Sequence, residues 1–357
     1  MDINLIAPLN QLGYGVVGYN VLKALSAANH GIAYFPIGDI KWSGDPMLKG
    51  LIDSVRHNAT FYTPTAPCLR IWHQHELDMF VGSPRIGWPI FELNKFTDRE
   101  KHHLRSVDKL FVCSNWAKEV VSKELNIDAS VIPLGVDTKT FYYDKAEVDK
   151  RPEWTRATTI YLNVGKWEVR KGHNELLEAF NKAFEPTDDV ELWMINDNPF
   201  IGHENEEWKR KYSNSKMGRN IKFLPRFESH DSLRKVFHHV DAGLFPSKAE
   251  GWNLEIPEMM ACGVNIIATN YSGHTEFVNE KNTRLLDVTG MELAKDGKWF
   301  HGQGEWCVFS VDQLVSHMRD VHDAKQSGKL SLNDAGIETA KNLSWTNTVK
   351  RIEEVLV

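Results

Sequence analysis

Two acidic residues, Glu250 and Glu258, frame the stretch of this chain whose residue types are best suited to chemistry, with seven residues between them. The run Ser247–Asn253 is polar and turn-forming. Pro257 suits the first turn of a helix, where its missing N–H costs nothing, and Gly263 suits a left-handed helix stop. A loop that feeds a helix N-terminus leaves backbone N–H groups unpaired, so we predict an anion site here, suited to a diphosphate.

A second group of charged residues, Lys166, Arg170 and Lys171, lies between a predicted buried strand and a predicted helix. Cations near the start of a helix oppose its dipole, so their presence indicates that an anion binds there. A carboxylate is repelled by phosphate. Glu250 and Glu258 are therefore better suited to accept hydrogen bonds from sugar hydroxyls beside the charge.

These motifs, set in the context Pro-Ser…Glu-Gly-Trp…Ala-Cys-Gly, resemble the E-x7-E signature of the retaining GT-B glycosyltransferases, family 4 (group 1) in particular. The resemblance implies that Glu250 meets the donor sugar and Glu258 the nucleotide ribose. It also implies that Lys171 reaches the diphosphate, with Lys166 in place of the family's Arg. The family usually has Gly where Asn253 stands, which is a departure in this sequence.

The same resemblance implies a set of donor-binding residues, in which the loop amides hold the diphosphate and the segment after a predicted strand at 221–224 seats the base. The set is Gly13, Gly15, Gly165, Arg226, Phe227, Gly251, Trp252, Asn253, Leu254 and Glu258. The implied catalytic residues are Lys171, Lys166, Glu250 and His75.

His75 belongs to the polar run His73–Glu76 that follows a predicted strand at 68–72. Polar residues at the carboxyl end of a strand lie at the mouth of the ligand crevice of an α/β sheet. The family often has His-x-His-Glu here, and by that match His75 contacts the outer hydroxyls of the donor sugar. His73 and His75 also have metal-ligand spacing, but no further ligand follows at a convincing interval, so no metal site is predicted. A purely structural histidine is the alternative.

Gly13, Gly15 and Gly18 spell G-x-G-x-x-G, and Asp39 stands near the position of a ribose-binding acid. This pattern supports a rival hypothesis, a nicotinamide-dependent dehydrogenase. However, the preceding strand is predicted to end near Ala7, whereas the dinucleotide fingerprint needs its first Gly directly after the strand. The glycosyltransferase family carries a Gly-rich loop at the same place, facing donor and acceptor. A flexible loop without a ligand is the third interpretation.

Composition sets the broad class. The chain has 357 residues, 42% hydrophobic and 25% charged, which favours two ordinary globular domains. The net charge of −6 disfavours a nucleic-acid partner, although the basic segment 208–219 leaves an anionic acceptor open. A solvated helix face is the more ordinary explanation of that segment. No apolar run approaches a membrane span, and four scattered cysteines without a signal peptide predict a cytoplasmic location.

We therefore expect an α/β protein of GT-B architecture, with two doubly wound Rossmann-like domains facing a central cleft. The expected acceptor-side domain covers residues 1–150 and the nucleotide-sugar-binding domain covers 157–342, with a linker within the charged segment 142–156. The closing helix, at about 343–357, is expected to cross back onto the first domain.

The expected reaction is retaining transfer of a sugar from a UDP- or GDP-linked donor, UDP preferred, to an acceptor hydroxyl. The acceptor is a saccharide or glycoconjugate, with a hydroxymethylated DNA base less favoured. Because the two lysines can stabilise the departing diphosphate, no metal or other cofactor is required. Three alternatives stay open: a nicotinamide-dependent oxidoreductase, a nucleotide-sugar epimerase, and a module that binds the donor without turnover.

Overall fold

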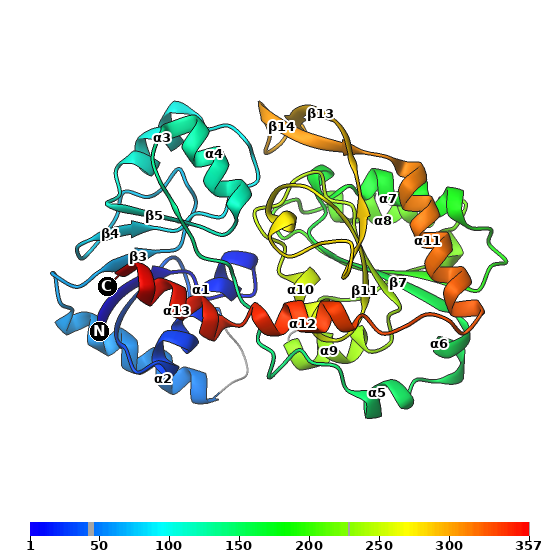
Figure 1. The fold of residues 1–357 in the computed structure, drawn as a ribbon, viewed down its shortest axis with the longest axis horizontal. Helices are drawn as coiled ribbons and strands as arrows, with labels where there is room; N and C mark the ends of the chain where they lie inside the picture. Colours follow the sequence, from blue (N-terminus) through cyan, green and yellow to red (C-terminus); the bar gives the residue numbers. More distant parts are fainter. Residues whose placement is uncertain (42–45, 228, 357) are drawn as a thin grey trace. The chain divides into compact units, whose positions relative to one another are not determined.

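The computed structural model describes residues 1–41, 46–227 and 229–356, and the chain divides into two compact units. The first unit contains residues 1–137 and 343–357, and the second contains 138–342. Each unit is built on a six-stranded parallel sheet (Figure 1). The chain therefore has the two Rossmann-like domains expected from its sequence. The structure places the division at 137/138, earlier than the boundary expected at 150.

The sheet of the first unit has the strand order β2-β1-β3-β4-β5-β6. Its strands are β1 (Asp2–Ala7), β2 (Gly31–Pro36), β3 (Cys68–Arg70), β4 (Arg85–Gly87), β5 (Lys109–Val112) and β6 (Ser130–Val131). Its helices are α1 (Gly13–Ala27), α2 (Pro46–Asn58), α3 (Asp98–Arg105), α4 (Asn115–Leu125) and α13 (Trp345–Leu356), with a short 3-10 turn, η1 (Ala59–Phe61). The order reverses at β1, so a ligand crevice is expected outside the carboxyl ends of β1 and β3.

The Gly-rich segment differs from its sequence interpretation as a loop. Helix α1 begins at Gly13, so Gly15 and Gly18 lie inside the helix. A Cβ on Gly15 would collide with Asn10, and one on Gly18 would collide with the carbonyl oxygen of Pro8. These glycines therefore let the backbone of the β1–α1 connection pack against the helix. This close packing explains the G-x-G-x-x-G pattern without a pyrophosphate and weakens the dehydrogenase hypothesis.

The sheet of the second unit has the order β9-β8-β7-β10-β11-β12, which is the doubly wound order with its reversal between β7 and β10. Its strands are β7 (Thr159–Gly165), β8 (Val190–Asn196), β9 (Ile221–Phe223), β10 (Ala242–Phe245), β11 (Asn265–Thr269) and β12 (Arg284–Leu286). Its helices are α5 (Lys145–Asp149), α6 (Glu153–Ala157), α7 (His173–Ala183), α8 (Glu204–Ser213), α9 (His230–Phe237), α10 (Glu255–Ala261), α11 (Val311–Gln326) and α12 (Asp334–Asn342). Three 3-10 turns complete it, η2 (Val169–Lys171), η3 (Gly218–Asn220) and η4 (Ser272–Glu276).

Helices α7 and α11 pack over one face of this sheet through a fully buried apolar core. The ring of Tyr161 in β7 meets Phe180 edge to face and Phe184 in a tilted arrangement, with ring centroids 6.3 and 5.8 Å away. Continuous apolar runs such as β7 are typical of parallel strands that are covered on both faces. The rigid core holds the carboxyl ends of β7 and β10 side by side, since Ala242 and Gly243 pair with Tyr161 and Leu162.

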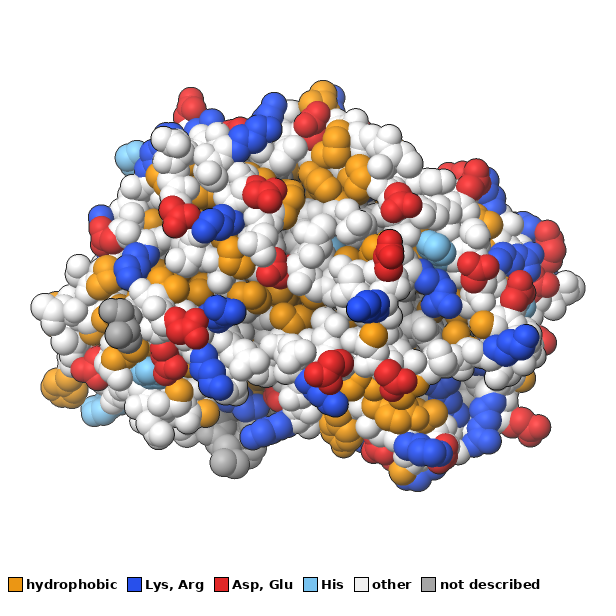
Figure 2. All heavy atoms as spheres, in the orientation of Figure 1, with side chains coloured by type: hydrophobic (Ala, Val, Ile, Leu, Met, Phe, Trp, Pro, Cys, Tyr) orange, Lys and Arg blue, Asp and Glu red, His pale blue; other side chains and the backbone are white. Residues whose placement is uncertain are grey.

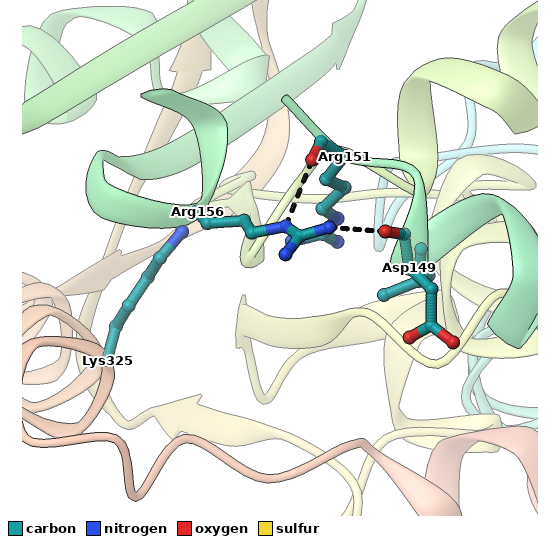
Figure 3. A pocket seen from close by; sticks show the side chains of 5 residues that line it. Asp149, Arg151, Arg156 and Lys325 are labelled. Carbon is teal, nitrogen blue, oxygen red and sulfur yellow. Dashed lines mark hydrogen bonds between the residues drawn. The ribbon is translucent and has the colours of Figure 1, made fainter. Parts of the chain in front are cut away.

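The segment 142–156, expected to be a linker, is instead part of the second unit and forms helices α5 and α6. Arg151 donates to the backbone oxygens of His238 and Val240 and pairs with Asp241. Lys325 pairs with the same carboxylate. With Arg156, these two cations line a cavity of about 400 Å³ (Figure 3). The high charge of residues 142–156 led to the prediction of a linker. In the structure, the charge of Arg151 instead attaches this segment to the second unit.

Residues 288–309 form an antiparallel hairpin, β13 (Val288–Lys295) and β14 (His301–Phe309), beyond the parallel sheet. The hairpin leaves Met291, Leu293 and Trp299 exposed. Elsewhere, Figure 2 shows Lys and Arg side chains interspersed with Asp and Glu over the face drawn. Among the described residues, no helix is both long and apolar enough to cross a bilayer.

Asp241 is buried between Arg151 and Lys325 and also accepts the backbone N–H of Ile160, at 2.8 Å. Removing one partner from a buried ion pair leaves uncompensated charge behind. Asp241→Ala should therefore lower the free energy of unfolding by about 3 kcal/mol in urea titrations. Asp149→Ala, which removes the exposed partner of Lys145, should leave the transition midpoint in place. Equal midpoints for the two variants would contradict this view of the cluster.

Candidate active site

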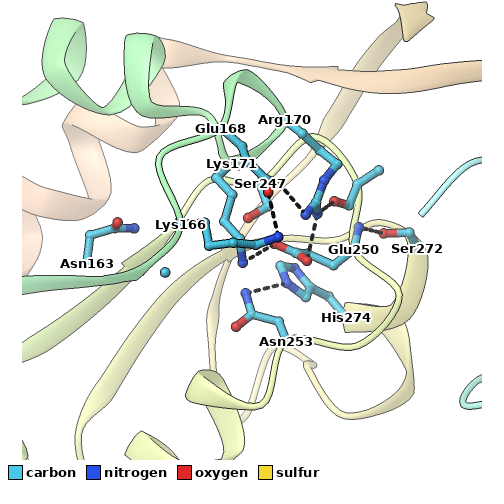
Figure 4. Close-up of polar contacts among 12 residues, drawn as sticks. Asn163, Lys166, Glu168, Arg170, Lys171, Ser247, Glu250, Asn253, Ser272 and His274 are labelled. Carbon is cyan, nitrogen blue, oxygen red and sulfur yellow. Dashed lines mark hydrogen bonds and ion pairs between the residues drawn. The ribbon is translucent and has the colours of Figure 1, made fainter. Parts of the chain in front are cut away.

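The reversal of strand order between β7 and β10 brings two loops together, residues 166–172 after β7 and residues 246–254 after β10. In doubly wound sheets, ligands bind outside the carboxyl ends of the strands at this switch point. The loops are joined by a backbone hydrogen bond of 2.7 Å from the N–H of Lys248 to the oxygen of Arg170. Both predicted motifs of the second unit thus meet at one edge of the sheet (Figure 4).

Two glycines make room for this approach. Gly172 has φ +70°, and a Cβ there would overlap the carbonyl oxygen of Pro246. Gly165 has φ +149°, and a Cβ there would meet Cδ and Nζ of Lys171 at 3.3 and 3.4 Å. The Lys171 side chain therefore lies along the end of β7 and is directed at the second loop. A larger residue at Gly172 would push the loops apart, and one at Gly165 would press on the Lys171 side chain.

Glu250 pairs with two of the three cations of the first loop. Its Oε1 lies 2.9 Å from Nζ of Lys171, and its Oε2 lies 2.8 Å from a guanidinium nitrogen of Arg170. All three residues are buried. Burial raises the pKa of Glu250, but Arg170 and Lys171 outweigh it, so the pKa lies well below its ordinary value. Burial lowers the pKa of Lys171, but Glu250 and Glu255 outweigh it and raise that pKa. Both groups are therefore charged in the folded protein.

Glu168 extends the cluster on the other side of Arg170. It contacts Arg170 and Lys166, each at 2.8 Å, while the Lys166 side chain stays 40% exposed. Three cations and two carboxylates leave this group with one net positive charge. Lys166 is thus held by Glu168 at the edge of the cluster, whereas Lys171 and Arg170 lie at its centre. An electropositive group at a strand end is suited to an incoming anion.

The loop after Glu250 presents backbone N–H groups. Asn253 has φ +81°, a conformation that Gly and Asn adopt most readily, which accounts for Asn where the resembling family has Gly. Leu254 caps α10 without a side-chain hydrogen bond, and Pro257 lies in the first turn, as predicted. Helix N-termini generally offer their first amides to a ligand, so this end stays the predicted anion site.

The turn Ser272–Gly273 supports Glu250 from below. The Ser272 hydroxyl accepts a hydrogen bond from the backbone N–H of Glu250 at 2.8 Å. The backbone N–H of Gly273 donates to the backbone carbonyl oxygen of Glu250 at 2.9 Å. A Cβ on Gly273 would overlap the carbonyl oxygen of Gly251. The backbone around Glu250 is therefore fixed independently of its carboxylate.

The remaining donor-side residues lie around the same sheet edge. Glu258 is half-buried on α10, one turn beyond the amides of the loop. Arg226 and Phe227 follow β9, which is the edge strand of this sheet, with Arg226 exposed and Phe227 half-buried. Their roles toward a ribose and a base stay predictions.

His75, Gly13 and Gly15 belong to the first unit, at its own switch point. The His75 ring stacks on His73 with centroids 5.3 Å apart, and His73 lies 4.6 Å from the ring of Tyr14. The structure therefore brings the Gly-rich start of α1 and the histidine run together. Among the described residues, no three His, Cys, Asp or Glu side chains are grouped closely enough to hold a metal ion.

Sequence reasoning missed several residues that organise the site. The sequence indicates an anion near Arg170 without giving that residue its own role, places Ser272 and His274 only in a turn under the donor site, and gives no role to Glu168. Lys166, Glu168 and Arg170 are spaced two residues apart, which would place them on one face of an extended segment and is a weak signal, since Arg170 lies in the 3-10 turn η2. Nothing in the spacing shows that His274 would contact Asn253, because they are brought together only by the β11–η4 turn.

His173 and His274 are buried in their neutral form, and burial lowers the pKa of each from 6.5 to about 4. Below pH 6.5 the unfolded chain binds protons that the folded chain does not. The free energy of unfolding should therefore fall by about 1.4 kcal/mol per pH unit for each histidine as the pH drops toward 4. His173→Gln should make this slope shallower by about that amount, while exposed His203→Gln should not change it. An unchanged slope in His173→Gln would contradict this burial argument.

Comparison with known families adds a finding to this geometry. Residues 144–297 match the family model of "Glycosyl transferases group 1". The chain is also 24% identical, over 60% of its length, to the GDP-mannose-dependent alpha-(1-6)-phosphatidylinositol dimannoside mannosyltransferase of Mycobacterium tuberculosis, of which it spans only 54%. It is 23% identical to the lipopolysaccharide core biosynthesis mannosyltransferase LpsB of Rhizobium meliloti, over 64% of this chain and 66% of that one.

Solved structures agree on the fold. A sucrose-phosphate synthase of Thermosynechococcus elongatus superposes with a TM-score of 0.73 at 16% identity, over 100% of this chain and 98% of that one. Anabaena Alr3699/HepE, solved in complex with UDP-glucose, superposes with a TM-score of 0.68 at 15% identity, over 100% and 99%. Residues 144–297 therefore resemble the glycosyl transferases group 1 family, and the chain has a fold of GT-B architecture.

Proposed function

We propose that this protein transfers a sugar, with retention of anomeric configuration, from a nucleotide diphosphate sugar to an acceptor hydroxyl. The observation that carries the proposal is the buried contact of 2.9 Å between Lys171 and Glu250 at the sheet switch point, next to the open amides before α10. The group 1 family match covers this site, and mannosyltransferases are among the similar proteins.

The proposed reaction breaks the bond between the anomeric carbon and the diphosphate oxygen and forms a bond to the acceptor oxygen. Negative charge grows on the leaving diphosphate as its bond breaks. Lys171 and Lys166, with the amides of Trp252–Leu254, are proposed to stabilise that charge, which lowers the barrier because the charge is larger in the transition state. The acceptor proton passes to the leaving phosphate oxygen on the same face, so no protein nucleophile and no metal ion is required.

Binding of the donor is divided among the remaining residues. We assign the donor sugar to Glu250, the ribose to Glu258, and the base to the segment Arg226–Phe227. The role of His75, in the first unit, stays a sequence prediction. Glu250 uses each carboxylate oxygen for one cation, and each oxygen keeps a lone pair for a hydroxyl donor. The sugar is thereby oriented by the same group that holds Lys171.

UDP is the proposed nucleotide. HepE, a structure of the same fold, was solved with UDP-glucose, while the mycobacterial relative is named for GDP-mannose. GDP-linked donors are therefore the comparison in any binding screen. A cytoplasmic location is proposed from the four cysteines, all of which are buried free thiols. The acceptor is proposed only as a hydroxyl compound.

Lys171→Ala should reduce sugar transfer by about 100- to 1,000-fold, because it removes the central cation from the departing diphosphate. The measurement is release of UDP from UDP-glucose, or of GDP from GDP-mannose, in the presence of acceptor. Lys182→Ala removes an exposed cation paired with Glu178 and should keep the wild-type rate. Wild-type turnover by a folded Lys171→Ala protein would remove Lys171 from the mechanism.

Glu258→Ala should weaken binding of free UDP by about tenfold in titration calorimetry, since the ribose loses its carboxylate partner. The exposed Glu280→Ala variant serves as the control for net charge and should bind as the wild type does. The same loss should be absent with 2′,3′-dideoxy-UDP, which lacks both ribose hydroxyls. An unchanged dissociation constant for UDP would count against the assignment of Glu258 to the ribose.

A further inference from the structure

The side chain of Asn253 stands out among the residues of the donor loop because its partner is a second buried side chain, His274. Asn253 Nδ2 lies 3.2 Å from Nε2 of His274, and the two residues are 7% and 0% exposed. We propose that Asn253 determines sugar specificity, with His274 orienting its amide so that Oδ1 accepts a hydrogen bond from a hydroxyl of the donor sugar. This inference rests on the proposed function of the site.

The protonation of His274 follows from its surroundings. Its Nδ1 lies 3.1 Å from the carbonyl oxygen of Thr269, which can only accept, so Nδ1 carries the proton. Burial keeps the ring neutral by lowering its pKa to about 4. Nε2 is then a bare acceptor.

The orientation of the Asn253 amide follows from that of the ring. A bare Nε2 on His274 requires a donor opposite it, and Asn253 can supply one only through its NH₂ group. The Thr269 hydroxyl is compatible with this arrangement, because it donates to the oxygen of Ser247 and leaves its own oxygen to face Nδ1. The hydrogen-bond chain therefore permits one rotation of the amide, with Oδ1 directed away from His274.

Oδ1 of Asn253 is then left as a buried acceptor without a partner in the described chain. Buried polar atoms are nearly always paired, and one that is not needs an explanation such as a missing ligand. The amide lies in the loop between Glu250 and the start of α10, and Figure 4 shows it beside the group formed by Lys171 and Glu250. A phosphate offers no donor to an amide oxygen. A sugar hydroxyl does.

A glycine would satisfy the backbone at this position equally well. The φ of +81° suits Gly, and Gly would leave no acceptor to satisfy. The side chain of Asn253 and the buried His274 opposite it therefore form an addition to the loop, with a geometry that presents one acceptor. The Asn253 side chain should therefore contribute to binding of the sugar part of the donor and not to binding of the nucleotide.

The test compares a nucleotide with its sugar conjugate by titration calorimetry on the whole protein, using UDP against UDP-glucose and GDP against GDP-mannose. Asn253→Gly should weaken binding of the sugar conjugate about tenfold more than it weakens binding of the free nucleotide. In Asn253→Asp, one carboxylate oxygen faces Nε2 of His274 once the new negative charge draws a proton to that nitrogen, and the other keeps an acceptor for the sugar. Any effect of the new charge on the diphosphate is common to both ligands. The ratio of the two dissociation constants should therefore stay within about twofold of wild type.

Deoxy analogues of the sugar that binds then locate the hydroxyl. The analogue that lacks the contacted hydroxyl should bind Asn253→Gly and wild type equally, whereas the other analogues keep the tenfold difference. Thermal unfolding of each variant checks that the protein is folded.

The outcomes separate the two proposals. If wild type binds a nucleotide sugar and Asn253→Gly weakens conjugate and free nucleotide equally, Asn253 only shapes the loop and this inference is overturned. The same holds if Asn253→Asp loses the sugar contribution as Asn253→Gly does. If wild type binds neither UDP-glucose nor GDP-mannose while binding free UDP or GDP, the inference also falls. Failure of all four ligands to bind contradicts the proposed function itself.

Discussion

A buried carboxylate must be matched by positive charge, and in this protein that requirement falls on Glu250. Removing an unpaired carboxylate from water costs several kcal/mol, so Glu250 can be ionised in its buried position only because Arg170 and Lys171 reach it. Each cation comes from the loop after β7, while Glu250 comes from the loop after β10. The ion pairs therefore hold the two loops in one arrangement and keep Lys171 charged where a diphosphate is proposed to leave.

This electrostatic constraint depends on the sheet beneath it. The reversal of strand order between β7 and β10 starts the two loops from neighbouring strand ends, and the apolar core under α7 and α11 keeps those ends fixed. Gly172 and Gly273 permit the close approach of the backbones, and Gly165 makes room for the Lys171 side chain. Preorganised charge of this kind stabilises a transition state without rearranging during the reaction. The same arrangement brings His274, in the turn after β11, into contact with Asn253 of the second loop.

Where the structure differs from the sequence predictions, the cause in each case is a tertiary contact that no local sequence pattern reveals. Helix α1 begins at Gly13, because Gly15 and Gly18 allow the preceding backbone to pack on the helix. The charged segment 142–156 is attached through Arg151 to Asp241, which no local pattern reveals. The sequence groups Arg170 with the other cations of its loop, and only the structure shows that it is buried between two carboxylates that are 82 positions apart along the chain.

The sequence alone determined the alternation of strands and helices around the site, since apolar runs and helix signals such as Pro257 and Gly263 act locally. It also determined the family resemblance and the proposed roles of Lys171 and Glu250. Only the tertiary structure decided how charges far apart in the chain pair, which histidines are buried, and which polar atom of Asn253 is left without a partner. Ionisation and hydrogen bonding depend on burial and on neighbours across loops, and these exist only once the sheet is assembled.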